Sequence, residues 1–476
     1  MQYRARRFFL ATGGLLVLIV LVTVIVRVFV NSESLKNRIE KSASQVMGME
    51  VRVEGPIRIL LLPAPGLRFH DLQVRKDKIE WMNSAGGEVR VRVLPLLRAQ
   101  IEVESLDLVE PNLRLKRDSE GAFNFIPLRR QDGKEGQILT IRSFRARGAT
   151  LTFTDQTSGK GIEAQNCDWT GRNLKWRSAG SSSSGLNLPD FQGNLKCGKI
   201  VHDVMEATGV EAQVFAQDRQ LKLSPLTGTL FDGRMKGILE SDLSGSSPVH
   251  SFELELADFR LERFTETYQR EQGVEGSLTF ASQLNSSGRL PSEMVASMSG
   301  WARLTGAGLV LHGLDLDKQL ARYESTQRFN LIDLAAFFVA GPAGLVVTRG
   351  YGFAGLFVDA GEKTLIRRLV SEWEIEKGIA VARDVAMSTA ENRIALAGAL
   401  DFVNSQFKEM RVAVIDAKGC AVVEQRIHGE FEDPKIEKPH FLVALVGPLF
   451  DMVKRGVALF REAECEPFYT GRLDPP

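Results

Sequence analysis

The residues that most often perform chemistry are scattered along this chain of 476 residues. Histidine-based hydrolases and metal sites need their side chains at short, regular spacings, such as two histidines four positions apart on one helix face. No such spacing connects the six histidines, which are His70, His202, His250, His312, His428 and His440. We therefore expect no metal site and no catalytic histidine.

Other common catalytic patterns are missing as well. The glycine-rich stretch GPAGLVVTRGYGFAG (341–355) lacks the G-x-G-x-x-G spacing of a dinucleotide-binding loop and the Lys-Ser/Thr of a phosphate-binding loop. There is no nucleophile elbow. Acidic residues are plentiful, but they alternate with apolar residues, which is typical of a solvated sheet face. The sequence therefore predicts a protein that is not an enzyme and has no cofactor.

Four cysteines are present, at Cys167, Cys197, Cys420 and Cys465. None forms a C-x-x-C pair, which argues against a zinc cluster or thioredoxin-like chemistry. The even number allows two disulfides in an oxidising compartment, but the spacing alone does not fix which cysteine pairs with which.

The overall charge is balanced, with 60 Lys and Arg against 59 Asp and Glu. A nucleic-acid-binding protein normally carries a surplus of positive charge on its binding surface. We therefore expect no nucleic acid among the partners.

The N-terminus contains an apolar run that is long enough to cross a membrane. Residues 8–26 carry no charge, and at about 1.5 Å per residue they nearly span a hydrocarbon core of about 30 Å, which residues 27–30 complete. Arg4, Arg6 and Arg7 precede the run and favour a cytoplasmic N-terminus. A cleaved signal peptide is the alternative, but its apolar region is typically shorter and ends at a small-residue cleavage site. We expect a retained, single-pass anchor over 8–30, with the bulk of the chain outside the cytoplasm.

A short helix is predicted directly after this anchor. In the stretch ESLKNRIEKSASQVM (33–47), Leu35, Ile39, Ala43 and Val46 share one face, and Gly48 supplies a typical helix stop. The helix is expected to cap the start of a sheet against the membrane. An ordinary surface helix fits the same pattern.

From residue 49 the apolar period changes from that of a helix to two, the period of a strand. Val51 and Val53 alternate with Arg52 and Glu54. Similar alternation occurs at 88–93, 101–108, 112–117, 150–155, 220–224 and 252–259. The parity slips between Val103 and Leu106, which indicates a bulge or bend. These runs predict a mostly β protein whose sheet has one apolar face and one charged, solvated face.

A faint internal repeat supports a sheet that grows by similar units. VESLDLVEPNLRL (103–115) aligns with IRSFRARGATLTF (141–153) at an offset of 38 positions. We interpret the repeat as a meander that adds similar strands in series. Polar, flexible breaks are expected at 129–137 and 178–187, and helical periodicity returns at 314–340 and 441–463. The last of these segments is basic and amphipathic, and either packs on the sheet or lies on a membrane.

Several blocks of the sequence together resemble the AsmA family of Gram-negative envelope proteins. The blocks near the N-terminus are the anchor followed by MGMEVRVEG, then LLLPAPGLRFHDLQV (61–74) and the stretch 89–125. Those near the C-terminus are GAGLVLHGLDL (306–316), DVAMSTAENRIALAGALDF (384–402), GCAVVEQRIHGEFEDP (419–434) and CEPFYTGRLDPP (465–476). Residues 160–290 are the least distinctive part of the resemblance.

The resemblance implies an inner-membrane-anchored periplasmic protein of the bridge-like lipid-transfer type. Its antiparallel-rich sheet is expected to be elongated and to curl into an apolar groove that carries phospholipid towards the outer membrane, in support of outer-membrane biogenesis. The implied partners are phospholipids and the inner membrane, with room for a periplasmic or outer-membrane partner. The candidate groove residues are Val51, Val53, Val91, Val103, Leu106, Leu113, Leu115, Phe144, Leu151 and Phe153.

The same resemblance divides the chain and suggests its disulfides. The expected regions are a cytoplasmic tip (1–7), the anchor (8–30), an N-terminal β-groove region (31–130), a middle β region (131–290) and a C-terminal β region ending in the amphipathic helix (291–476). Because Cys420 and Cys465 lie in family-like blocks, we expect them to pair, with Cys167 and Cys197 as a second pair.

Two alternatives to the groove remain open. In an ordinary β-sandwich the apolar face would pack against a second sheet and bind nothing. In an anchored assembly factor, an exposed sheet edge would capture the unfolded strands of outer-membrane proteins.

Overall fold

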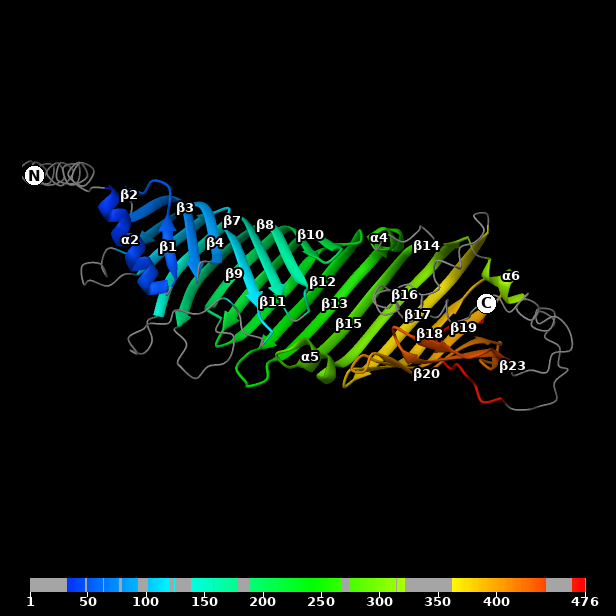
Figure 1. The fold of residues 1–476 in the computed structure, drawn as a ribbon. Coiled ribbons are helices and arrows are strands. Elements are labelled where there is room, and N and C mark those ends of the chain that lie inside the picture. The colour runs from blue at the N-terminus through cyan, green and yellow to red at the C-terminus, as the bar shows by residue number, and fades with distance from the viewer. Residues whose placement is uncertain are drawn as a thin grey trace, which may run out of the picture. The chain divides into compact units, whose positions relative to one another are not determined.

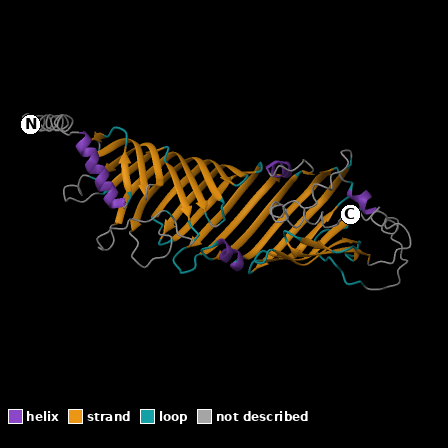
Figure 2. Cartoon of the chain, viewed as in Figure 1, coloured by secondary structure: helices purple, strands orange, loops and turns teal. Residues whose placement is uncertain are grey.

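The computed structural model describes residues 32–47, 49–62, 64–76, 79–92, 102–119, 124, 138–156, 158–177, 188–267, 274–313, 315–321, 362–441 and 465–475. These residues are mostly β, in a large mixed and mainly antiparallel sheet with a few short helices, as the alternating sequence predicts (Figures 1 and 2). The chain divides into two compact units, which are Met1–Asp203 with Gly209–Leu221, and Val204–Thr208 with Lys222–Pro476.

Among its described residues, the first unit contains one helix, nine whole strands and most of β10, whose first four residues belong to the second unit. The elements are α2 (Ser32–Met47), β1 (Glu50–Val53), β2 (Arg58–Leu60), β3 (Gly66–Lys76), β4 (Ile79–Val91), β5 (Val103–Val109), β6 (Asn112–Arg117), β7 (Ile138–Asp155), β8 (Gly161–Arg177), β9 (Asp190–His202) and β10 (Met205–Gln217). Strands β1 and β2 both pair with β3, and the ladder continues through β4, β5 with β6, β7, β8 and β9.

The internal repeat has a direct structural meaning. Its two copies are β5 with β6, and β7, and residues 38 positions apart are paired neighbours, such as Leu106 with Phe144 and Leu113 with Leu151. The pairing is parallel, whereas a meander would make it antiparallel. The meander interpretation of this repeat is therefore wrong. Alternation has the same period in both kinds of ladder, so the sequence pattern does not distinguish them.

The predicted bulge in β5 is confirmed. Val91 pairs with Val103 and Arg90 pairs with Ser105, so Glu104 is the extra residue on β5. Because of this extra residue, Leu106 lies on the same face as Val103, although strict alternation would place it on the opposite face.

Helix α2 caps the first edge of the sheet. The backbone N–H of Val51 donates to Ser44 Oγ (2.9 Å) and that of Val53 donates to Glu40 Oε1 (2.7 Å). These donors would otherwise be free on the outer side of β1 and open to pairing with another chain. The helix lies along the first strands in Figure 1, and the prediction of a helix over 33–47 is confirmed.

The second unit contains the remaining elements. They are β11 (Gln220–Leu230), which begins at the boundary, β12 (Gly233–Asp242), β13 (Val249–Arg260), α4 (Leu261–Thr267), β14 (Val274–Glu275), β15 (Ser277–Ser287), α5 (Pro291–Ser297), β16 (Ser299–His312), α6 (Leu316–Ala321), β17 (Lys363–Glu376), β18 (Ile379–Ser388), β19 (Arg393–Asp401), β20 (Gln406–Ile415), β21 (Ala421–Glu430), β22 (Pro434–Ile436) and β23 (His440–Phe441). Among the described residues, the strand pairs from β12 to β23 are all antiparallel.

A continuous hydrophobic core fills much of the second unit. It joins residues of β13 to β21 with α4 and α6, and its centre is fully buried at Phe259, Leu309, Leu316 and Ile366. Helix α6 is fixed to the turn between β18 and β19, where Asn392 Nδ2 donates to Asp317 Oδ1 (2.6 Å). This side of the sheet therefore has an ordinary packed interior in the second unit.

The C-terminal segment 465–475 packs on the opposite face of β18 to β20. Tyr469 and Leu473 are buried against the small side chains Ala386, Ala395 and Ala413. The alanines leave a shallow surface into which the two larger side chains fit.

Several predicted segments lie outside the described residues. They are the anchor over 8–30, the loops at 129–137 and 178–187, most of the helical segment 314–340, and nearly all of the amphipathic segment 441–463. Within the described residues, no helix combines the length and apolar character that a membrane span requires.

Candidate functional site

The apolar face of the first unit is built from rows of residues that pair across neighbouring strands. One row runs from Val74 through Met82, Leu113 and Leu151 to Ala164, on β3, β4, β6, β7 and β8. Because side chains alternate between the two faces of a sheet, in-register pairing keeps each row on one face. The row shows how the repeat produces a continuous apolar surface.

The solvent exposure of this face changes along the row. Val74 is 1% exposed, in a cluster with Val51 and Trp81 against which Ala43 of α2 packs. Leu151 is 36% exposed. Ala164 at the end of the row is 6% exposed, so along this row the apolar face is buried near α2, most exposed at Leu151 of β7 and buried again at β8.

The candidate groove residues fall into two groups by burial. Val51 and Val53 are buried, at 6% and 5% exposure, because α2 and β3 cover them. The other eight keep part of their surface in contact with solvent, and these are Val91, Val103, Leu106, Leu113, Leu115, Phe144, Leu151 and Phe153. Only this second group is available to a ligand.

Three aromatic rings lie together on the next strands. Phe144 is 5.1 Å from Trp169 and 5.8 Å from Phe191, measured between ring centroids, and all three pairs meet edge to face. The Phe144 ring lies over Gly171, where a Cβ would approach it to 2.2 Å. The Trp169 indole nitrogen is buried and has no hydrogen-bond partner among the described residues. Trp169 lies in GIEAQNCDWT (161–170), a partly alternating stretch that is not among the strands and groove residues predicted above.

The opposite face of the first unit is charged. Arg114 contacts Glu80 across the strands (2.9 Å), and Lys196 contacts Glu211 (2.8 Å). Arg68 donates to Glu88 (2.8 Å), and this hydrogen bond holds the pKa of the Glu88 carboxyl below its usual range. Cross-strand pairs of this kind are weak individually, but they show that this face meets water.

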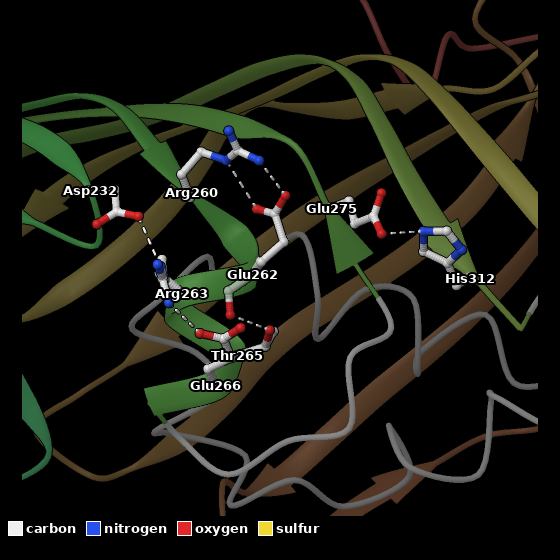
Figure 3. A network of polar contacts seen from close by, with 8 residues as sticks. All are labelled: Asp232, Arg260, Glu262, Arg263, Thr265, Glu266, Glu275 and His312. Atoms are coloured by element: carbon white, nitrogen blue, oxygen red, sulfur yellow. Dashed lines mark hydrogen bonds and ion pairs between the residues drawn. The ribbon is translucent and has the colours of Figure 1, made fainter.

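In the second unit, helix α4 closes one end of the apolar face. Leu261 and Phe264 of α4 are buried, and the Phe264 ring is 5.2 Å from that of Phe231. Figure 3 shows the polar contacts that hold this helix, in which Arg263 contacts Asp232 (2.8 Å) and Arg260 contacts Glu262 (2.8 Å). These charged side chains attach α4 to the sheet, and the described part of the chain contains no group of three or more His, Cys, Asp or Glu residues that could hold a metal ion.

Away from α4, part of the apolar face of the second unit is less completely buried. Leu239, Phe252 and Leu284 pair across β12, β13 and β15 and are only partly covered. On the other face, Arg303 donates to Glu372 (2.9 Å) and holds the pKa of that carboxyl below its usual range. The second unit thus also has one apolar and one charged face.

Both pairs of cysteines are joined in the structure. Cys167 and Cys197 are directly paired residues of β8 and β9, with Cα atoms 4.0 Å apart. The second disulfide joins Cys420, just before β21, to Cys465 at the start of the C-terminal segment. It holds that segment where Tyr469 Oη donates to Asp384 Oδ1 (2.5 Å).

The structure is that of a β-rich protein whose sheet has one apolar and one charged face. Its two disulfides are typical of compartments outside the cytoplasm. The family model for the AsmA family matches residues 1–180 and 139–385. The chain therefore belongs to the AsmA family, as the order of its sequence blocks indicates. No curated protein and no solved structure matches the chain at a significant level.

Family membership sets the general frame for function. The AsmA family is associated with the cell envelope and is not known for enzymes, and its general roles are in outer-membrane biogenesis and lipid transport. Together with the two disulfides, this indicates a location outside the cytoplasm.

Proposed function

We propose that this protein is anchored in the inner membrane and carries phospholipid on the apolar face of its sheet towards the outer membrane. The observation that supports the proposal is the partial exposure of large apolar side chains on β5 to β7, with Leu151 at 36%. An uncovered apolar face costs free energy in water, and acyl chains would recover about 0.8 kcal/mol for each CH₂ that they bury there.

The remaining apolar positions fit the same role. Leu106, Leu113 and Phe144 lie on the same side of neighbouring strands, so an acyl chain could pass from one to the next without meeting a charge. No ligand geometry is fixed along such a surface, and no catalytic group is needed. The curling of this face into a groove, the phospholipid cargo and the membrane anchor are all parts of the proposal.

Capture of unfolded strands at a sheet edge has less support as a function. The outer edge of β1 is bonded to α2 through Val51 and Val53. In the second unit, β21 is paired with β22 and β23, which are only three and two residues long and so offer little edge to another strand. An incoming strand would have to displace α2 from β1, or pair with these very short strands.

Site-specific photo-crosslinking in intact cells tests the proposal. A photoreactive amino acid at Leu113 or Leu151 should form adducts with phospholipid, which mass spectrometry would identify after detergent extraction. Arg114, whose side chain pairs with Glu80 on the charged face, is the matched control and should form none. Equal labelling at Leu151 and Arg114, or labelling of protein alone, would show that the apolar face does not carry lipid.

A further inference from the structure

The short turn between β2 and β3 carries an exposed apolar side chain, Leu62. Leu62 is 68% exposed, more than any other large apolar side chain in the described residues, and Ile59 is 36% exposed. A single exposed leucine is common on protein surfaces. What distinguishes Leu62 from other exposed apolar residues is the position of its turn relative to α2.

Hydrogen bonds fix the direction of α2 along β1. Lys36 Nζ donates to the Glu54 carbonyl (3.5 Å), Glu40 accepts from Val53, and Ser44 accepts from Val51. Helix and strand therefore run in opposite directions, with the first turn of α2 beside the end of β1. Figure 1 shows β2 at this same end of α2.

The β2–β3 turn lies beyond the start of the helix. On β3, Leu72 is the partner of Val53 and Gly66 is the partner of Leu60. The turn therefore lies six residues of β3 beyond the level of Val53, or about 20 Å. The start of α2 at Ser32 is eight residues before Glu40, or about 12 Å. The tip of the turn would therefore extend about 8 Å past the first residue of α2.

Combined with the predicted membrane anchor, this distance indicates how deep the turn would lie at the membrane. The anchor ends at residue 30 and α2 begins at Ser32, so the first turn of α2 would lie at the membrane surface. A tip that extends about 8 Å further would reach the boundary between headgroups and acyl chains, the depth at which interfacial apolar side chains are found. This step rests on the anchoring that forms part of the proposed function.

The turn is also held in place and carries positive charge behind its apolar tip. Arg90 donates to the carbonyls of Leu62 (3.5 Å) and Ala64 (3.2 Å), which fixes the backbone of the turn. Arg58 lies opposite Arg68, and both Arg68 (2.8 Å) and Arg90 (2.5 Å) form ion pairs with Glu88, so three arginines stand beside one carboxylate. An apolar tip with arginines behind it matches the chemistry of an anionic lipid surface, where arginine side chains contact the headgroups.

We propose that the β2–β3 turn inserts Leu62 into the outward-facing leaflet of the membrane that holds the anchor. The first strands of the sheet would then stand directly on the bilayer, so that phospholipid need not cross water to reach the apolar face.

Fluorescence quenching in reconstituted membranes tests this insertion. The full-length protein, with Leu62→Cys labelled by an environment-sensitive fluorophore, is placed in vesicles of phosphatidylethanolamine and phosphatidylglycerol that contain a spin-labelled phospholipid. All four natural cysteines are in disulfides, so the introduced thiol is the one that reacts. The matched control is Ile79→Cys, which is 59% exposed at the opposite end of β3. We expect several-fold stronger quenching at position 62 than at position 79.

Flotation of the vesicles separates the two possible failures. If the protein floats with the vesicles but the probe at position 62 is quenched no more than that at position 79, the insertion of the turn is wrong while the anchor stands. If the protein does not float, the proposed anchoring is wrong and the insertion falls with it.

Discussion

Leu113 of β6 and Leu151 of β7 are 38 positions apart in the chain and are direct neighbours across a parallel pair of strands. The internal repeat therefore places one apolar residue beside its own counterpart. Because the offset is constant, Leu115 meets Phe153 in the same way. A repeat in sequence becomes a continuous apolar surface, and this surface is where we place the acyl chains.

The substitution Leu151→Asp should abolish lipid carriage while leaving the protein folded. Leu151 is 36% exposed, so a carboxylate there keeps much of its hydration and should lower the free energy of unfolding by only about 1–2 kcal/mol. The charge would nevertheless interrupt a path that must be apolar along its whole length. We expect at least a fivefold loss of phospholipid that co-purifies with the protein, measured by mass spectrometry.

The control for this substitution lies one residue further along β7. Thr152 is on the opposite face, between Arg114 of β6 and Glu163 of β8, so Thr152→Asp adds the same charge on the solvated face beside one cation and one anion. It should leave both the fold and the bound lipid unchanged. An unfolded Leu151→Asp protein would mean that this face is a packed core, and an unchanged lipid content would mean that lipid does not pass Leu151.

The sequence was sufficient to predict elements whose signal is local. The periodicity of residues 33–47 predicted α2, and the parity slip after Val103 predicted the bulge at Glu104. The one-sided alternation predicted an apolar and a charged face, and both are present in each unit.

Features that depend on distant parts of the chain could not be predicted in this way. The period of two is the same in parallel and antiparallel strands, so the direction of β7 beside β6 was missed. Val51 has the same alternating pattern as Leu113, yet it is buried at 6% exposure because a helix that precedes it packs nearby. The contact between Asp384 and Tyr469 joins residues 85 positions apart, and no local pattern indicates it.

One of the two hydrogen bonds that cap the first sheet edge can be removed by a single substitution. In Glu40→Ala, the N–H of Val53 loses its acceptor, which is worth about 1.5 kcal/mol for a bond to a charged group. Hydrogen exchange at the Val53 amide should then become about tenfold faster. Lys41→Ala, an exposed position on the same helix, is the control and should leave that rate unchanged. Equal exchange in both variants would mean that Glu40 does not protect β1.

Loss of the second disulfide should free the C-terminal segment. A closed loop of 45 residues contributes about 4 kcal/mol in the chain-entropy description. Cys420→Ser, Cys465→Ser and the double variant should therefore lose similar stability in the second unit, together with faster proteolysis near Tyr469. Joint replacement of Cys167 and Cys197 is the control, because it leaves the C-terminal segment attached. A segment that stays protease-resistant in Cys420→Ser would contradict this role.

Acid stability should depend on Asp401. Its carboxylate is fully buried, and its hydrogen bonds with Lys408 (2.6 Å) and Asn404 hold its pKa far below the usual range. A carboxyl whose pKa is lowered on folding stabilises the protein above its unfolded pKa of about 4, and this stabilisation is lost as the pH falls towards the lowered value. Asp401→Asn should cost about 1–3 kcal/mol at pH 7 and less at pH 3. Denaturant titrations measure the difference in unfolding free energy between the wild-type protein and Asp401→Asn. If that difference is as large at pH 3 as at pH 7, the role given to Asp401 is wrong.

Alkaline stability should depend on Tyr469. Burial raises the pKa of its phenol, and the hydrogen bond to the Asp384 carboxylate raises it further. A group whose pKa is raised on folding stabilises the protein fully below its unfolded pKa, which is about 10 for tyrosine, and the stabilisation falls as the pH rises above that value. The wild-type protein should therefore lose stability above about pH 10 more steeply than Tyr469→Phe.

The same substitution has an effect at neutral pH that separates the hydroxyl from the ring. Tyr469→Phe keeps the packing against Ala386 and Ala395, but it removes a donor to Asp384 and an acceptor for the Leu473 N–H (3.1 Å). Asp384 is 6% exposed and would keep the ion pair with Arg472 (3.4 Å) but lose the hydroxyl donor, so we expect a loss of about 1–3 kcal/mol at pH 7. Ultraviolet absorbance of the phenolate gives the direct check. In the wild-type protein one more tyrosine than in Tyr469→Phe should resist ionisation until the protein unfolds. If the two absorbance titrations instead differ by one tyrosine that ionises freely near pH 10, Tyr469 is not buried against Asp384 and the C-terminal segment is not held in this way.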